Sequence, residues 1–383
     1  MRRITADYIY TANSSPIKNG VVSIDNQGNI LSVEAHRSGD EEKYQGIICP
    51  GFVNAHCHTE LSFAKNKIAE NSGIDNFISQ LEQLKQSTSL AEKQEAIKMA
   101  IDEMQHEGIV AVGDIINTAL SIEPKKKSNI DFYTFLEIYG SQAMMAERIW
   151  YSALELWEQL PTPKNIVPHA TYSLSRTLFQ KIRDFQEYSS TITIHHLESE
   201  GEISFFKEGI GPMADRLKSW GLDLPMHIPT HKRPLESIGS FLAQNKKVLL
   251  VHNTFIEKQD IDFANNNFEQ VYYALCVNAN LFIENKLPPV ELLKQQSHTI
   301  CIGTDSLASN KQLSILAEMK TLDKYFAIPL EELIRWACYN GAYALGMESK
   351  LGSIEAGKKP GLILLTNNNE TFDLQQTTVK VIA

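Results

Sequence analysis

Cysteine is scarce in this chain of 383 residues, and long apolar runs are absent. The cysteines are odd in number and widely spaced, which argues against a disulfide framework and for reduced thiols, at Cys49, Cys57, Cys276, Cys301 and Cys338. No run approaches the ~18 apolar residues that span a bilayer. No apolar segment of the signal-peptide kind follows the charged N-terminus. We therefore expect a cytoplasmic protein with no membrane partner.

An excess of positive charge is also missing, because 46 acidic residues outnumber 36 basic ones and give a net charge of −10. This balance argues against a nucleic-acid partner and for a small-molecule substrate that local groups recognise. The composition is compatible with a homodimer. The His-x-Glu and Pro-Cys-x-x-Cys ligands of the cytidine-deaminase type are absent too, which excludes that zinc-deaminase architecture.

A His-x-His pair is the strongest local signal. The stretch from Pro50 to His58 continues an apolar run that begins at Ile47, as expected of one buried strand. Residues i and i+2 share a face of a strand, so His56 and His58 can present two imidazoles to one point. Cys57 points away and is not counted as a ligand.

Further polar residues follow apolar, strand-like runs at His195, His252 and Asp305. Histidines and an aspartate at strand ends form a ligand set suited to Zn²⁺ or Fe²⁺, with a position left for water. Asp305 also fits a simpler use, because such a residue often caps the next helix.

The order of expected elements indicates an α/β fold. Eight strand-like segments, most followed by a helical one, predict a (β/α)₈ TIM barrel over residues 49–348, which fits the typical ~250 residues plus insertions. The strands are expected to end at or near His56, Val112, Ile138, Val167, His195, Val251, Leu275 and Ile302. Helices are expected at 74–84, 90–107, 142–159, 176–187, 235–244 and 330–345, with Gly108 as a C-cap. Short strands at 7–11, 20–24 and 30–33 and the return of the chain after Gly346 predict a small β-sandwich from residues 1–48 and 349–383.

These motifs together resemble the amidohydrolase superfamily in its metal-dependent deaminase branch. The family's first two ligands match His56 and His58, and its aspartate matches Asp305 within Gly303–Asn310. The segment 194–199 resembles the family pattern His-Leu-Ala-Glu-Ser. This register implies that His195 is the third ligand. The alternative, His196 as the ligand with Glu198 structural, remains open. The closing segment Leu351–Leu365 is also similar, although Pro360 and Gly361 replace the family's usual Ala-Asp.

The same resemblance implies roles around one divalent metal, because binuclear members carry a lysine at the end of strand 4 and the segment 166–173 has none. Glu198 would move protons, Asp305 would bind metal and accept a proton from water, and His252 would orient the attacking water. His169 would bind substrate. Buried structural histidines are the alternative for both His169 and His252.

The stretches His58–Phe63 and Gly73–Ile78 resemble the branch of aminofutalosine, methylthioadenosine and S-adenosylhomocysteine deaminases. The resemblance implies hydrolytic deamination of a 6-aminopurine nucleoside with a 5′ substituent. One alternative is hydrolysis of another C–N or C–Cl bond, as in a chlorohydrolase or a guanine or cytosine deaminase. The other is a barrel that binds without catalysis.

Overall fold

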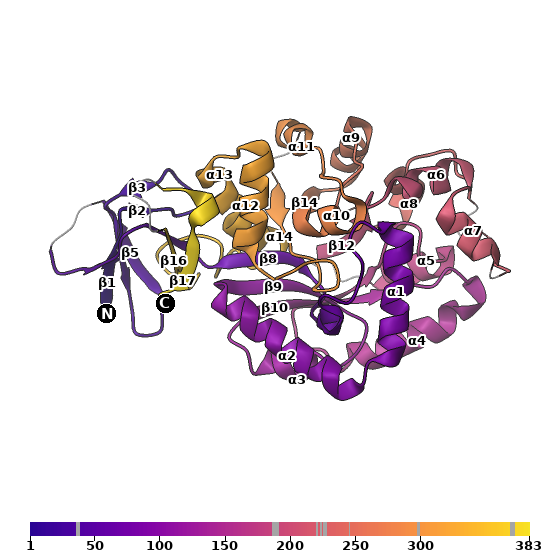
Figure 1. Cartoon of the computed structure of the whole chain (residues 1–383), viewed down its shortest axis with the longest axis horizontal. Coiled ribbons are helices and arrows are strands. Elements are labelled where there is room, and N and C mark those ends of the chain that lie inside the picture. The colour runs from indigo at the N-terminus through magenta and orange to yellow at the C-terminus, as the bar shows by residue number, and fades with distance from the viewer. Residues whose placement is uncertain are drawn as a thin grey trace.

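The computed structural model divides the chain into a small β lobe that carries both termini and a larger α/β lobe (Figure 1). It describes residues 1–35, 39–185, 191–219, 221–222, 224, 228–244, 246–296, 299–367 and 372–383. The end of the helix expected at 176–187 lies outside these ranges, as do three histidines to which the sequence assigns no role, His36, His227 and His298. Within the described residues, no helix is long and apolar enough to cross a membrane.

The small lobe holds two sheets whose apolar faces share one buried cluster. One sheet has the order β5-β4-β1-β6, formed by Ile30–Glu34, Val21–Ile24, Arg2–Thr5 and Glu42–Lys43. The other has the order β17-β16-β7-β2-β3, formed by Thr378–Val381, Leu362–Thr366, Ile47–Pro50, Tyr8–Ile9 and Ile17–Lys18. Ile4 and Val22 from the first sheet pack with Ile48 and Leu364 from the second. Residues 1–50 and the C-terminal segment thus bury apolar area jointly.

A tight turn joins β4 to β5, between the strands expected at 20–24 and 30–33. Gly28 takes a φ of +85°, and the Asp25 carboxylate accepts the backbone N–H groups of Gln27 and Asn29 at 2.8 and 2.9 Å. These bonds satisfy turn donors that strand pairing leaves free, and β4 and β5 pair antiparallel on either side of the turn.

The apolar run from Ile47 to His58 is two strands rather than the one that was expected. β7 ends at Pro50 and pairs with β16 and β2 in the small lobe, whereas β8 (Phe52–Cys57) starts the α/β lobe. Gly51 lies between the two strands. A side chain does not fit at this position, because a Cβ there would lie 2.3 Å from the Val110 side chain. Strand pairing in the small lobe therefore extends two residues beyond the boundary predicted after residue 48.

Eight parallel strands form the centre of the α/β lobe, at the predicted places. They make two four-stranded sheets, β11-β10-β9-β8 and β12-β13-β14-β15. The strands after β8 are β9 (Ile109–Ile116), β10 (Asp131–Ile138), β11 (Lys164–Pro168), β12 (Thr191–His196), β13 (Lys247–His252), β14 (Gln270–Leu275) and β15 (Ile300–Ile302). Short seams join the sheets: the backbone N–H groups of Thr304 and Asp305 donate to His56 O at 3.1 Å, and His195 N–H donates to His169 O at 3.0 Å. The strand ends that carry the candidate ligands meet at these seams.

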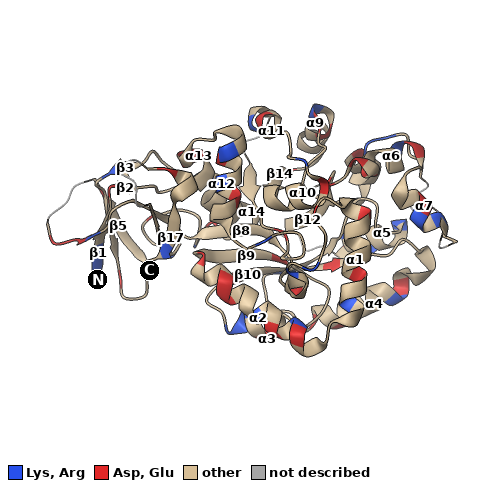
Figure 2. Ribbon diagram, viewed as in Figure 1, with Lys and Arg blue, Asp and Glu red and all other residues tan. Residues whose placement is uncertain are grey.

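Helices surround the strands (Figure 1). Figure 2 shows acidic and basic residues interspersed along α1, α2 and α3 in this view. The helices are α1 (Gly73–Ser87), α2 (Leu90–His106), α3 (Ile122–Lys126), α4 (Ala146–Trp157), α5 (Arg176–Phe185), α6 (Glu200–Glu208), α7 (Pro212–Ser219), α8 (Pro234–Ile238), α9 (Lys258–Asn267), α10 (Val277–Glu284), α11 (Val290–Gln296), α12 (Ile315–Phe326), α13 (Leu330–Ile334) and α14 (Gly341–Ala344). Short 3₁₀ segments occupy 59–64, 143–145, 239–241 and 374–376.

Three expected helices differ from those observed. α4 is shorter than 142–159 because its first residues form a 3₁₀ turn, and α8 stops at Ile238 before another 3₁₀ turn. The helix expected at 330–345 contains a π-helical segment, Arg335–Asn340, between α13 and α14. Gly108 follows α2 with a φ of +76°, as its C-cap role requires.

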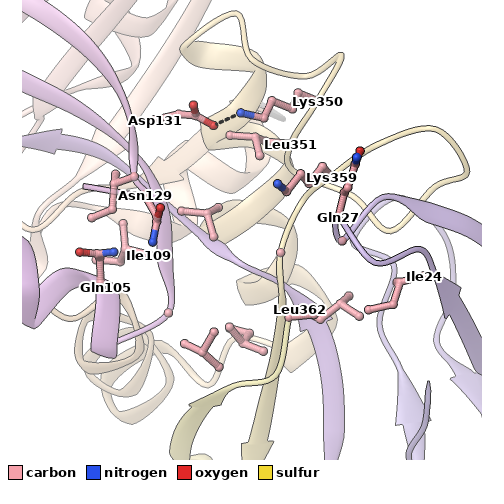
Figure 3. Close-up of a pocket in the computed structure, with 18 of the residues that line it drawn as sticks. Ile24, Gln27, Gln105, Ile109, Asn129, Asp131, Lys350, Leu351, Lys359 and Leu362 are labelled. Carbon is pink, nitrogen blue, oxygen red and sulfur yellow. Dashed lines mark hydrogen bonds and ion pairs between the residues drawn. The ribbon is translucent and has the colours of Figure 1, made fainter. Parts of the chain in front are cut away.

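A cavity of about 650 Å³ lies between the two lobes (Figure 3). It lies beside the N-terminal ends of β9 and β10, and Lys350 reaches across to Asp131 at 2.6 Å. It is larger than the pocket that holds the candidate ligands, but none of those histidines lines it. Size alone is a poor guide here, because parallel α/β proteins keep their chemistry at the opposite, C-terminal strand ends.

Candidate metal centre and substrate pocket

Three histidines converge at the C-terminal ends of β8 and β12. Because β8 is extended, His56 and His58 lie on one face, and their Nε2 atoms are 3.1 Å apart. His195 adds a third Nε2 at 3.2 Å from that of His58. The nitrogens therefore define one point, as the strand register predicts.

Asp305 reaches the same point from the loop after β15. Its Oδ1 lies 3.8 Å from His56 Nε2 and 3.6 Å from His58 Nε2. The other oxygen, Oδ2, accepts the Ser309 hydroxyl. The residue has a φ of +56° and donates its backbone N–H to His56 O, so the loop turns back over β8. This contact at the seam holds the carboxylate beside the histidines.

The tautomer of His195 leaves a nitrogen lone pair free to bind a cation. His195 donates Nδ1–H to the backbone oxygen of His169 at 2.5 Å, so its Nε2 carries a lone pair. That lone pair faces His58 Nε2, which faces His56 Nε2 in turn. Burial lowers the pKa of all three imidazoles and keeps them neutral. Neutral imidazoles aimed at one point beside a carboxylate are a donor set for a divalent metal such as Zn²⁺ or Fe²⁺.

The two adjacent histidines of β12 point to opposite sides of the strand. His195 joins the cluster, whereas His196 Nδ1 lies 3.0 Å from Asn253 Oδ1 in the layer outside the strands. Leu197 then takes a φ of +48°, which turns the chain so that Glu198 faces the pocket. His195 thus faces the cluster and His196 faces away from it, which is the register that the resemblance implied. The ligand role of His195 itself stays a prediction.

Glu198 and His252 form a buried acid–base pair beside this cluster. Glu198 Oε1 lies 3.5 Å from His252 Nε2, while His252 Nδ1 lies 2.9 Å from Asn280 Oδ1 and must donate there. In a neutral ring His252 Nε2 is then the acceptor. Burial raises the pKa of Glu198 to about 7, although nearby His252 opposes the rise. A carboxyl near neutrality can both hold and release a proton.

His252 also lies close to the candidate ligands. It groups with His56 and Asp305, with one ligand atom of each within 4.8 Å of the others. Its φ of +74° at the end of β13 aims the ring into the pocket.

His169 follows β11 and lines the pocket beside His195, with ring centroids 4.8 Å apart. Its Nδ1 lies 3.1 Å from the Ser173 hydroxyl. Burial lowers the pKa of His169 to about 3, so the ring is neutral. No lysine stands among Ile166–Ser173 at this strand end, in line with a single metal.

The pocket around these residues measures about 420 Å³. Its outer wall is apolar and comes from α1 and α7, through Ile74, Phe77, Ile78, Leu81, Met213 and Leu217. Two ion pairs stand in this wall: Lys85 with Glu82 at 2.8 Å, and Arg216 with Asp75. The pocket therefore joins a polar floor to an apolar wall, as ligand sites commonly do.

Sequence reasoning missed Glu137 at the end of β10. Its Oε1 lies 3.6 Å from His195 Nδ1, its Oε2 accepts an amide N–H of Asn117 at 3.3 Å, and burial raises its pKa to about 8. An acidic residue at the end of an apolar strand was the available signal. Lys85 was missed as well, because helical periodicity does not say which face of α1 meets the pocket.

Sequence analysis also missed a buried ion pair. Asp114 on β9 accepts the backbone N–H and hydroxyl of Thr59, at 2.9 and 2.8 Å, and pairs with Lys125. Thr59 follows His58 directly, so this pair fixes the chain just after a candidate ligand.

Comparison with known proteins supports a deaminase-like relationship. An adenosine deaminase of Helicobacter pylori is 26% identical over 88% of this chain and 82% of its own length. An aminodeoxyfutalosine deaminase of Nitratiruptor sp. is 24% identical over 90% of this chain and 85% of its own.

Solved structures show the same fold. The aminofutalosine deaminase of Helicobacter pylori in complex with methylthio-coformycin superimposes with a TM-score of 0.83 at 20% identity, over 98% of this chain and 94% of that one. An atrazine chlorohydrolase of Arthrobacter aurescens complexed with zinc gives 0.75 at 17%, over 98% and 91%. At such identities the likeness carries the TIM-barrel fold alone. The amidohydrolase family model matches residues 47–382, nearly the whole chain, and the protein therefore belongs to the amidohydrolase family.

Proposed function

We propose that this protein is a hydrolytic deaminase of a 6-aminopurine nucleoside with a 5′ substituent, releasing ammonia and the matching 6-oxopurine. The observation that carries the proposal is Glu198, a carboxyl with a pKa near 7 beside His252 and the histidine cluster. Deamination needs such a group, because a ring nitrogen must gain a proton before water attacks and the amine must gain one to leave. The names of the relatives, adenosine and aminodeoxyfutalosine deaminase, agree with it.

In this proposal one divalent metal, Zn²⁺ or Fe²⁺, is held by His56, His58, His195 and Asp305. When bound, the ion would supply Lewis acidity for the attack of water on the substrate. The zinc of the chlorohydrolase structure favours Zn²⁺.

The side chains then divide the proton work. Glu198 in its protonated form donates to the ring nitrogen next to the amino-bearing carbon, and as a carboxylate it then takes the proton of the newly formed hydroxyl group and delivers it to the departing amine. Asp305 accepts the other proton of the attacking water, and that proton returns Glu198 to its protonated form for the next turnover. His252, with Nδ1–H fixed on Asn280, keeps its Nε2 lone pair toward the reacting atoms. His169, neutral at working pH, hydrogen-bonds the substrate.

In the proposed binding mode, the 5′ substituent contacts the apolar wall of the pocket. With the purine between Glu198 and His169, the rest of the nucleoside extends toward α1 and α7, where Phe77 and Leu81 offer apolar surface. An apolar 5′ group gains by leaving water there, whereas a bare 5′ hydroxyl does not.

We also propose that residues 49–348 form the catalytic barrel and that 1–48 with 349–383 form a β-sandwich domain. The two sheets of the small lobe and their shared apolar cluster support this division. A cytoplasmic location fits five free, buried cysteines. A homodimer stays a prediction.

The decisive test is ammonia release from metal-loaded protein across a substrate panel. The panel holds adenosine, methylthioadenosine, S-adenosylhomocysteine, aminofutalosine, guanine, cytosine and a chlorotriazine, the last also assayed for chloride. We expect the highest kcat/KM among the 5′-substituted adenine nucleosides. Activity confined to guanine, cytosine or the chlorotriazine would replace the proposal by one of the alternative hydrolases. No turnover of any compound at full metal loading would favour a binding barrel.

A further inference from the structure

A second buried carboxyl, Glu202, lies behind the pocket in the first turn of α6. It is 1% exposed, and no ion pair joins it to any cation in the part of the chain that the structure describes. It does not line the substrate pocket. A buried carboxyl without a cation is costly, so its hydrogen bonds must account for its place.

The polar groups that act on this carboxyl come from two different loops. The Thr171 hydroxyl, two residues after His169 in the loop after β11, donates to Glu202 Oε1. Burial raises the pKa of Glu202 to about 8, and the Thr171 hydroxyl and the backbone N–H groups of Glu198 and Leu197, in the loop after β12, oppose that rise. One side chain thus joins the loops that carry the proposed acid and the proposed substrate-binding histidine.

The turn at Leu197 makes this connection important. Its φ of +48° is a conformation that a branched residue rarely adopts, so surrounding contacts must hold it. On one side its carbonyl accepts the N–H of Phe255 at 3.0 Å. On the other side its backbone N–H acts on the Glu202 carboxyl, against the rise that burial gives the pKa of that group. Relaxation of the turn would swing the Glu198 carboxyl away from His252.

We infer that Glu202 is a positioning residue, which fixes the backbone of Glu198 against Thr171 so that the Glu198 carboxyl faces the reacting ring. This inference rests on the proposed deaminase function. Glu202 touches neither the substrate pocket nor the candidate metal ligands, so its effect must pass through the two loops.

The first test is Glu202→Gln in metal-loaded protein. The amide keeps the size of the side chain but replaces one acceptor oxygen by an NH₂ group that cannot accept the N–H donors. We expect kcat on the best substrate to fall roughly 10- to 100-fold, the scale of a misplaced catalytic group. KM should stay within a few fold, and metal content should stay unchanged.

A pair of substitutions at Thr171 tests the same link without changing charge. Thr171→Val removes the hydroxyl at nearly constant shape and should lower kcat. Thr171→Ser keeps the hydroxyl and should restore most of it. A general packing defect would harm the smaller serine at least as much as valine, so the order of the two variants separates positioning from packing.

Glu41→Gln is the matched control, because Glu41 is a buried carboxyl of the small lobe, 8% exposed and far from the pocket. Its kcat should match the wild type. Normal kcat in Glu202→Gln, or equal kcat in both Thr171 variants, would overturn the positioning role, as would a fall that only follows lost metal. An inactive wild type across the whole panel would instead reject the deaminase function, and this role with it.

Discussion

Glu198 is the residue on which the chemistry depends most. Glu198→Gln keeps the size of the side chain and removes its titrating proton. We expect kcat to fall by roughly 10²-fold or more, the usual scale of general acid–base contributions, while metal content stays near that of the wild type. Steady-state kinetics with elemental analysis on one sample checks this. Full activity in the variant would assign the proton transfers to another group.

The two histidines of β12 allow a sharp comparison, because they are adjacent and face opposite sides. His195→Ala should lose most of its metal, since it removes one of three converging nitrogens. His196→Ala should keep about one equivalent per chain, because His196 bonds Asn253 outside the cluster. Elemental analysis measures the metal content of both variants. Loss of metal from His196→Ala but not from His195→Ala would mean that His196, and not His195, is the ligand.

Buried carboxyls give the fold a pH dependence. Burial raises the pKa of Glu318 to about 8 from its ordinary 4.5. The folded state then holds this proton more tightly than the unfolded state. The resulting stabilisation is complete below pH 4.5 and is lost as pH rises toward 8.

The test replaces this proton-binding group. Glu318→Gln should show a smaller decline of Tm between pH 5 and 8 than the wild type, whatever its Tm at acid pH. Thermal melts across that range measure it, and parallel declines in the two proteins would show that Glu318 is not the source.

At the level of elements, α1 forms the apolar wall. Phe77→Ala should lower kcat/KM for methylthioadenosine relative to adenosine by roughly tenfold or more, because it removes apolar surface from the 5′ side. Leu84→Ala is the matched control, since Leu84 lies on α1 but does not line the pocket. An equal loss on both substrates would place the 5′ group elsewhere.

The elements differ in how well sequence indicates them. The strand ends were predictable, because β8 to β15 are short, mainly apolar runs that polar residues follow, and period-2 register puts His56 and His58 on one face. Two-residue strands such as β3 and β6 carry no periodicity and were missed. The break at Gly51 was misread because apolar residues flank it on both sides, and only the approach of Val110 shows why a glycine stands there.

In the whole molecule, the proposed metal would connect the two sheets of the barrel. Removing it with a chelator should lower Tm by roughly 5 °C or more, since its binding energy is available only to the folded state. Restoring Zn²⁺ should restore Tm. An unchanged melting curve in protein shown to be metal-free would mean that the seams hold without it.

The seam between β8 and β15 also bears on how the protein is made. Asn54 donates to the Thr304 hydroxyl at 2.7 Å, and these partners are 250 positions apart in the chain. On a ribosome that adds 5–20 residues each second, His56 and His58 would wait more than ten seconds for Asp305 to be synthesised. During that interval the first sheet has an open edge and an incomplete ligand set. We therefore expect nascent chains to depend on protection of that edge, and the protein to gain its metal only after Asp305 has been synthesised.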